Sequence, residues 1–231
     1  MDQAQRTQRP IIRDAGAAEI LASRWRVGGP GDQAAAAEAA LSSIVAAPGL
    51  LRCSLFRGVD EPTLVAVLQS ANAGPATSPT SADLGAAIRA SVPAARLDWQ
   101  ERASPHVSWR PDAARDFGCL VVVRQPLKRP SPRVQSEWVD AVIAALESDV
   151  EPNPDLHAAT FFFAVDGAHV LNLAEWSSAE AHRAALGRGA VGQHGSIGAT
   201  ARWRAARGHP GITPEHEVGR YTFIGAVEPE G

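Results

Sequence analysis

LHAATFFFAVDGAHVLNLAEW (residues 156–176) contains two apolar runs that flank the pair Asp166-Gly167. Asp-Gly between two apolar runs is typical of a β-hairpin with a tight turn, because both turn residues tolerate the left-handed backbone that such a turn needs. The sequence therefore predicts two antiparallel strands, at residues 156–165 and 169–176, and the rest of the fold is worked out from this hairpin.

The elements expected around the hairpin give the order βαββαβ. Ser177 with Glu180 three residues later predicts a capping box for the helix that follows the hairpin. In chain order, the second half is expected to contain strand 117–124, helix 133–147, the hairpin, helix 179–186 and strand 217–224.

The first half repeats this order. Asp32 stands where a helix N-cap is expected. The expected elements are strand 19–27, helix 33–47, strands 50–57 and 63–69, helix 82–90, and one or two strands within 97–109.

A βαββαβ order is the ferredoxin-like arrangement, in which two helices cover one face of a four-stranded antiparallel sheet. The other face must be buried, and two fused copies can pack sheet against sheet. We therefore predict an α+β protein with a flexible arm at 1–14 and two ferredoxin-like repeats, 15–112 and 113–231, whose sheets pack face to face.

The composition excludes several classes of protein. Of the 231 residues, 45% are hydrophobic and 20% are charged, which is typical of a globular domain. A net charge of −3 favours neither a nucleic-acid nor a membrane partner. We expect a cytoplasmic protein, because no secretory signal is visible and Cys53 and Cys119 are too few for a disulfide framework. The seven histidines have no metal-site spacing, so we expect no metal.

The strand at residues 169–176 carries the most informative side chains. Period-2 alternation places four residues on one face: Val170, Asn172, Ala174 and Trp176. Leu171 and Leu173 share the other face, which we expect to pack against the helices. An amide and an indole in an apolar face can orient a ligand. The alternative is a purely structural Trp176, with Asn172 bonded to a neighbouring strand.

Five motifs, in this order, resemble the antibiotic biosynthesis monooxygenases, in particular tandem members from actinomycetes. They are SRWRVG with Pro30, PGLL at 48–51, WVDAVIAALESD at 138–149, VLNLAEWSSAEAH at 170–182 and RYT at 220–222. Within this family, the chain resembles the ring-opening oxygenases of angucycline pathways, of the jadomycin, gilvocarcin and kinamycin type. The resemblance implies the dimeric α+β barrel fold, here within one chain, which can be a monomer or a homodimer.

The resemblance also implies site residues. Anthrone oxygenases of this family have an Asn, a Trp four residues on and a Tyr six further, which match Asn172 and Trp176, with His182 in the Tyr position. The first half has Ala66 and Ser70 at the matching places, so the active cleft is expected in the second repeat. We expect the cleft to be lined by Val170, Ala174, Phe161 and Phe163, and by His194 and Arg188 on a Gly-rich lid.

By this resemblance the protein is expected to be an oxygenase that tailors an aromatic polyketide, by hydroxylation, quinone formation or oxidative ring opening. It would use O₂ with either no cofactor or reduced flavin from a separate reductase. The alternative is a non-oxidative cyclase or intermediate-binding protein on the same fold. Arg202, Trp203 and Arg207 are interpreted as an ordinary helix face, or else as a cationic and aromatic rim.

Overall fold

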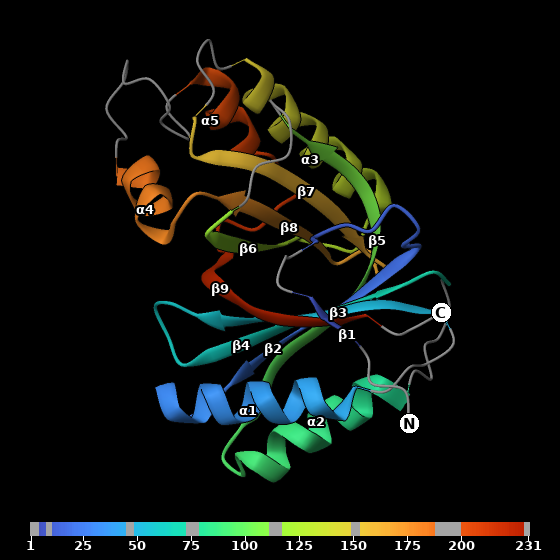
Figure 1. Cartoon of the computed structure of the whole chain (residues 1–231). Coiled ribbons are helices and arrows are strands. Elements are labelled where there is room, and N and C mark those ends of the chain that lie inside the picture. Colours follow the sequence, from blue (N-terminus) through green and yellow to red (C-terminus); the bar gives the residue numbers. More distant parts are fainter. Residues whose placement is uncertain are drawn as a thin grey trace. The chain divides into compact units, whose positions relative to one another are not determined.

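The computed structural model describes residues 5–7, 11–44, 49–72, 79–110, 117–148, 153–187 and 200–228 (Figure 1). Its strands are β1 Gln5–Thr7, β2 Glu19–Arg26, β3 Leu50–Gly58, β4 Thr63–Ser70, β5 Arg96–Trp109, β6 Cys119–Pro126, β7 Leu156–Ala164, β8 His169–Trp176 and β9 Glu217–Glu228. Its helices are α1 Pro30–Ser43, α2 Pro79–Ser91, α3 Pro132–Glu147, α4 Ala179–Gly187 and α5 Ala201–Arg207. The protein has an α+β fold with antiparallel pairing of its strands.

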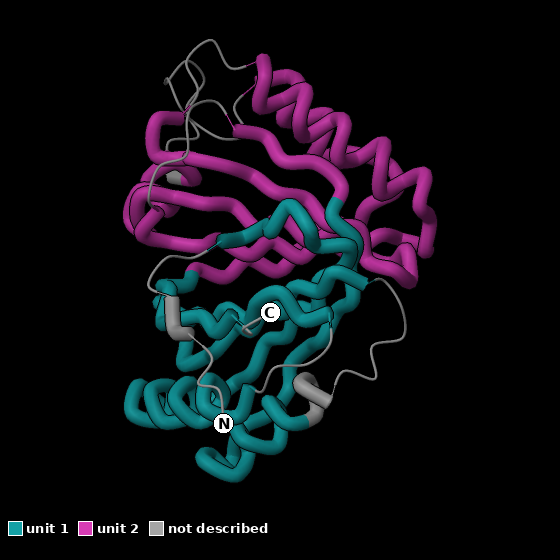
Figure 2. Tube along the Cα trace, turned by 45° about the vertical axis from the view of Figure 1, so that its right-hand side comes forward, with its two compact units in different colours: residues 1–105, 221–231 teal, residues 106–220 magenta. Residues whose placement is uncertain are grey.

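The chain forms two compact units (Figure 2). Unit 1 comprises residues 1–105 and 221–231, and unit 2 comprises residues 106–220, so the chain changes unit inside β5 and again inside β9. Unit 1 has the strand order β3-β4-β2-β5, and unit 2 has the corresponding order β7-β8-β6-β9. The boundaries of these units differ from those of the predicted repeats, 15–112 and 113–231. The end of β5 belongs to unit 2, and the end of β9 belongs to unit 1.

Helices α1 and α2 lie together against one face of the unit 1 sheet (Figure 1). The side of α1 that faces the core carries Ala36, Ala37 and Ala40, all of them buried. Alanine side chains are short, so the helix can approach the sheet closely. The core beneath contains Leu64 and Leu68 of β4, which leaves the helix-facing side of this sheet apolar.

Unit 2 is covered by α3, α4 and α5, with α5 packed beside α3. Ser131 caps α3, and its hydroxyl accepts from the Val134 N–H. The Trp138 indole of α3 donates to the Ala206 carbonyl at 3.2 Å, which fixes α5 on the flank of α3. The hairpin between β7 and β8 is confirmed, with Gly167 in the left-handed region at φ +73°.

Three sequence expectations about helix ends are wrong. Helix α1 begins at Pro30 with Gly29 as its N-cap, so Asp32 lies in the first turn instead of capping it. The helix ends at Ser43, short of residue 47, because Ile44 is already extended. Ser178, not Ser177, caps α4: its hydroxyl accepts from Ala181 N–H at 3.0 Å.

The physical reason for the shifted α4 cap is a competing hydrogen bond. The Ser177 hydroxyl donates to the Asp155 carboxylate at 2.6 Å and is therefore not available to the helix. A capping box needs Glu at the third position after the cap, which is residue 181 when Ser178 is the cap, so Glu180 does not form one. The hydrogen bond from its own backbone N–H, with smaller contributions from Arg183 and Ser178, lowers the pKa of the Glu180 carboxyl.

Part of the predicted flexible arm is packed on unit 1. Residues 5–7 form β1, which pairs with residues 226–228 of β9. Ile12 is 3% exposed, and the Gln69 amide donates to the Ile11 carbonyl at 2.8 Å. Residues 97–109, for which one or two strands were expected, lie in the single strand β5.

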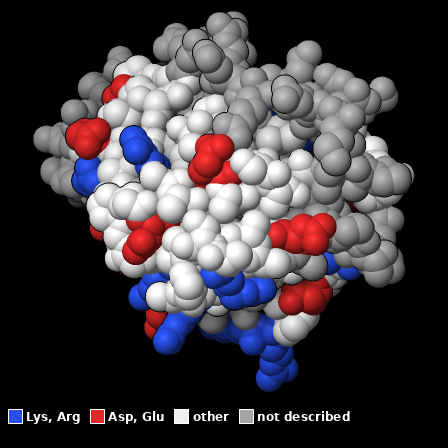
Figure 3. Space-filling model, turned by 60° about the horizontal axis from the view of Figure 1, so that its bottom comes forward, with Lys and Arg blue, Asp and Glu red and all other residues white. Residues whose placement is uncertain are grey.

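The described helices include none that is long and apolar enough to cross a membrane. On the face drawn in Figure 3, acidic and basic side chains both occur among a majority of uncharged residues. The mixture agrees with a formal net charge of only −3.

Replacing Gly118 by Ala should destabilise the protein. A Cβ at Gly118 would clash with the Ser177 carbonyl oxygen, and Gly118 N–H also donates to the Trp176 carbonyl at 3.0 Å. Because the clashing atom belongs to the backbone, we expect the free energy of unfolding to fall by about 1–3 kcal/mol. Urea unfolding measures this. Gly31→Ala is the control, since a Cβ there meets nothing within 4 Å, and equal stabilities of the two variants would contradict the prediction.

Burial raises the pKa of the Cys53 thiol to about 12, whereas a cysteine in an unfolded chain ionises near 8.5. Above pH 8.5 the Cys53 thiol of the unfolded chain loses its proton, whereas the folded protein keeps it. The free energy of unfolding therefore falls as the pH rises above about 8.5. At pH 10 the loss amounts to about 2 kcal/mol. Denaturant titrations at pH 7 and pH 10 should show a smaller decline for Cys53→Ala. Equal declines would show that Cys53 is not the source.

Candidate functional site

Strand β8 holds the central position of the candidate site. It pairs with β6 on one side and with β7 on the other, in the register Asn172↔Val123 and Asn172↔Phe161. Both edges of the strand are thus fixed by backbone hydrogen bonds, and alternation decides where each side chain points. Asn172, Ala174 and Trp176 point toward the helices of unit 2 and reach a common cavity.

The expected orientation of the two faces is wrong in one respect. Leu171 and Leu173 were expected to pack against the helices, but they lie on the opposite face of the sheet, outside the core formed with α3 and α5. The alternation itself is confirmed. Alternation shows which residues share a face and does not show which face the helices cover.

A cavity of about 270 Å³ lies between the sheet of unit 2 and its helices. This volume lies just below the usual range for ligand pockets, about 300–1,000 Å³. Every lining residue belongs to unit 2. They are Val121, Val123, Gln125, Trp138, Val142, Leu146, Leu156, Ala159, Asn172, Ala174, Trp176, His182, Leu186, Trp203, Ala206, Arg207, Ile212, Pro214, His216 and Val218.

The three residues proposed as catalytic, Asn172, Trp176 and His182, meet at this cavity. The edge of one ring faces the other in the Trp176–His182 pair, with 4.9 Å between centroids and an interplanar angle of 72°. Trp176 is 1% exposed and His182 is 5% exposed, so the bulk solvent reaches neither. Helix α4, which carries His182, contacts both β6 and β8.

Three buried polar atoms of cavity-lining residues have no hydrogen-bond partner: Asn172 Oδ1, Trp176 Nε1 and Trp203 Nε1. Leaving a buried donor or acceptor unpaired costs about 1–3 kcal/mol. The rest of the lining is predominantly apolar. An arrangement of two N–H donors and one amide oxygen in an apolar cavity is suited to a ligand that carries oxygen atoms.

Arg220 determines how His182 can act. The Arg220 Nε–H donates to His182 Nδ1 at 3.0 Å. A guanidinium has no acceptor, so Nδ1 must supply the lone pair and the proton of the neutral ring must be on Nε2. In this state His182 can donate a hydrogen bond through Nε2, and its basic nitrogen is already engaged.

The residues proposed to bind substrate separate into three groups. Ala174 lines the cavity. Val170 and Phe161 belong to the hydrophobic core of unit 2 without lining the cavity, and Phe163 stacks on His106 with 4.0 Å between ring centroids. Arg188 and His194, with the rest of the Gly-rich lid at residues 188–199, lie outside the described residues.

Sequence reasoning missed the wall that α3, α5 and the segment before β9 provide. Trp138 and Trp203 both line the cavity, although Trp203 had been interpreted mainly as part of a helix face. Thr200 caps α5 by accepting from Trp203 N–H, and a Thr three residues before the indole is a local signal for the start of this helix. Its packing on α3 cannot be deduced from local sequence.

The corresponding face of unit 1 has a different chemistry. Leu64, Ala66 and Leu68 of β4 are buried in the core beneath α1 and α2. At the position that corresponds to Trp176, Ser70 bonds to the backbone of Asn72. These β4 side chains provide an apolar wall, and the buried indole of the same core, Trp25, donates its N–H to the Ser23 hydroxyl.

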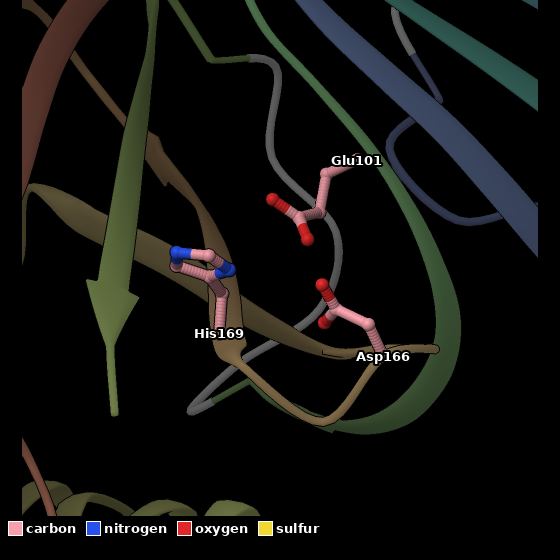
Figure 4. Close-up of side chains that lie close together, drawn as sticks. All are labelled: Glu101, Asp166 and His169. Atoms are coloured by element: carbon pink, nitrogen blue, oxygen red, sulfur yellow. The ribbon is translucent and has the colours of Figure 1, made fainter. Parts of the chain in front are cut away.

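Asp166 and His169 flank the β7–β8 turn, and Figure 4 shows their side chains together with that of Glu101, a residue of unit 1. Asp166 Oδ1 accepts from Ala168 N–H at 2.8 Å, and His169 Nδ1 lies 3.4 Å from Arg124 Nη2. Taken by itself, unit 2 supplies two of these side chains, fewer than the three or more protein ligands that a metal site usually has.

No protein-family model matches the chain, and no curated protein matches it. Among solved structures it is similar to an anthrone oxidase-like protein, with 16% identity, 93% of this chain and 94% of that chain covered, and a TM-score of 0.68. It is also similar to a proposed monooxygenase from Lactobacillus acidophilus NCFM (12% identity, 92% and 97% covered, TM-score 0.55) and to a proposed chlorite dismutase (12% identity, 89% and 95% covered, TM-score 0.55). At these identities the similarity establishes the fold alone.

The tautomer of His182 can be tested directly. Long-range ¹H–¹⁵N spectra of protein labelled at histidine should show His182 with a bare Nδ1 and a protonated Nε2 at neutral pH, because Arg220 donates to Nδ1. In Arg220→Met the donor is lost, and the Nδ1 signal should shift. Spectra showing a proton on Nδ1 in the unaltered protein would contradict this assignment.

Proposed function

We propose that the protein is an oxygenase of the antibiotic biosynthesis monooxygenase type that modifies an aromatic polyketide, by hydroxylation, quinone formation or oxidative ring opening. One observation carries the proposal: Asn172, Trp176 and His182 meet in an apolar cavity where Asn172 Oδ1 and Trp176 Nε1 have no partner. The similarity in fold to an anthrone oxidase-like protein supports it.

The cavity offers what the oxygenation of a phenol requires. A deprotonated phenol is electron-rich enough to pass an electron to O₂, and its negative charge must be stabilised away from water. The apolar lining excludes water, and the Trp176 N–H can donate to the phenolate oxygen while the indole stacks on the rings. Asn172 Oδ1 can accept from a neighbouring substrate hydroxyl.

His182 completes this set as a second donor. Because Arg220 occupies Nδ1, the imidazole can stabilise a substrate oxyanion through its Nε2–H. The chemistry proposed for the side chains is therefore stabilisation and orientation of the substrate anion. When reduced flavin is supplied by a reductase, it would provide electrons to O₂, and the reaction without a cofactor would draw them from the substrate itself.

A non-oxidative role on the same fold is the second candidate, and the Arg220–His182 hydrogen bond is the observation that favours it. With its basic nitrogen engaged, His182 is poorly placed to remove a proton from a substrate. A protein that only binds a polyketide intermediate, or a cyclase that orients one, would need the same cavity without a base.

We also propose that the two units are fused ferredoxin-like repeats whose sheets pack face to face, as in the dimeric α+β barrels. The repeated strand order supports the proposal. A crystal structure in which the sheets of the two repeats do not face each other would contradict it.

Oxygen uptake with a polyphenolic polyketide tests the function, measured with and without reduced flavin. Trp176→Phe removes the N–H and keeps a buried aromatic ring, so turnover should fall much more than stability, because this N–H has no partner to lose and only part of the indole volume is removed. Asn172→Ala should lower kcat/KM about 5- to 150-fold, which corresponds to about 1–3 kcal/mol, the value of a hydrogen bond to a charged or buried group. Ser70→Ala in unit 1 is the control and should be almost without effect.

Two results would change the conclusion. Tight binding of polyketides without any oxygen consumption would favour the non-oxidative role. A variant series in which Ser70→Ala is impaired and Trp176→Phe is not would place the active cleft in unit 1.

A further inference from the structure

Three indoles line the cavity of unit 2, and their N–H groups are in different states. Trp138 Nε1–H donates to the Ala206 carbonyl at 3.2 Å, so this indole has a structural partner. Trp176 Nε1 and Trp203 Nε1 are buried and have none. Two of the three cavity indoles thus keep an unused donor.

The two unused donors approach the cavity from different layers of the unit. Trp176 lies on β8, in the sheet, whereas Trp203 lies on α5, in the helix layer beside α3. Trp203 is 8% exposed, and its Nε1 is shielded from solvent, so water does not replace the missing partner. One ligand oxygen can satisfy one of these donors, and a second oxygen is needed for the other.

The wall that carries Trp203 is anchored firmly. Beyond α5, the Lys128 N–H donates to the Gly211 carbonyl at 2.9 Å and the Thr213 N–H donates to the Pro126 carbonyl at 3.1 Å. The Gln125 side chain, which itself lines the cavity, donates to the Thr213 carbonyl at 3.0 Å. These bonds hold the backbone of the segment that follows α5, while the Trp203 indole has no hydrogen bond of its own that would prevent it from turning toward a ligand.

We propose that Trp203 is a substrate-binding residue and that the cavity takes a compact aromatic ligand with two separated acceptor oxygens, one for Trp176 and one for Trp203. The volume of about 270 Å³ suits two or three fused rings. Asn172 Oδ1 accepts from a hydroxyl on the same ligand when one is present. The inference rests on the proposed function, because it names the class of substrate for the same site. It requires both shielded indoles to turn slightly toward the ligand.

Binding of two bicyclic probes tests the proposal: 1,4-naphthoquinone has two carbonyl oxygens, and 1-tetralone has one. Both cysteines are buried, which protects the protein from alkylation by the quinone. For the quinone, Trp203→Phe and Trp176→Phe should each weaken binding about tenfold, and the double variant about a hundredfold. For 1-tetralone, the double variant should lose only about tenfold.

Stability separates a binding role from a structural one. Trp138→Phe and Trp203→Phe remove the same buried volume, but only Trp138→Phe also removes a bonded N–H, so Trp138→Phe should lower the melting temperature more than Trp203→Phe does. Trp25→Phe, a buried indole of unit 1, is the control for binding and should bind both probes as the unaltered protein does.

The outcomes for this inference and for the proposed function are distinct. Three binding results would each overturn the inference. The first is that neither probe binds, and the second is that Trp203→Phe binds the quinone as the unaltered protein does. The third is that the double variant loses equal affinity for both probes. Oxygen uptake with a polyphenol by a protein whose Trp203→Phe variant is fully active would overturn it and leave the proposed function standing. The predicted binding pattern without oxygen uptake would support the inference and overturn the oxygenase.

Discussion

The pairing of β8 on both of its edges is the constraint on which the candidate site depends. With β6 on one side and β7 on the other, the strand can neither slip nor rotate, because a shift by one residue would reverse every side chain and break two ladders. Asn172 and Trp176 therefore stay on the helix-covered face, four residues apart. The cavity then forms where the helices leave room above this fixed pair.

The two units show how helix composition decides whether such room exists. Alanines on the buried face of α1 let that helix settle closely on a sheet face filled by Leu64 and Leu68. In unit 2 the helices present larger side chains, including Trp138 on α3 and Trp203 on α5. Trp138 and Trp203 line the cavity that lies between these helices and the sheet.

Local sequence was sufficient for the hairpin, for strands β2, β3, β4 and β6, and for the face shared by Asn172 and Trp176, because these depend on alternation and on turn chemistry. Local sequence did not show which face of β8 the helices cover, the face with Asn172 or the face with Leu171. Alternation separates the two faces and treats them alike. Local sequence also chose Ser177 over Ser178 as the cap of α4. Both serines fit locally, and Asp155, distant in the sequence, decides between them.

The rest of the site depends on contacts between residues far apart in the chain. Arg220 lies 38 residues after His182, and the contact between them changes the imidazole from a candidate base to a donor. Trp176 and Trp203 each add to the cavity lining a buried N–H that has no hydrogen-bond partner. An unpaired donor lowers the stability of the empty protein and is relieved when a ligand oxygen binds. The stability lost in the empty cavity is regained as affinity, and this affinity favours ligands whose oxygens are placed to meet the donors.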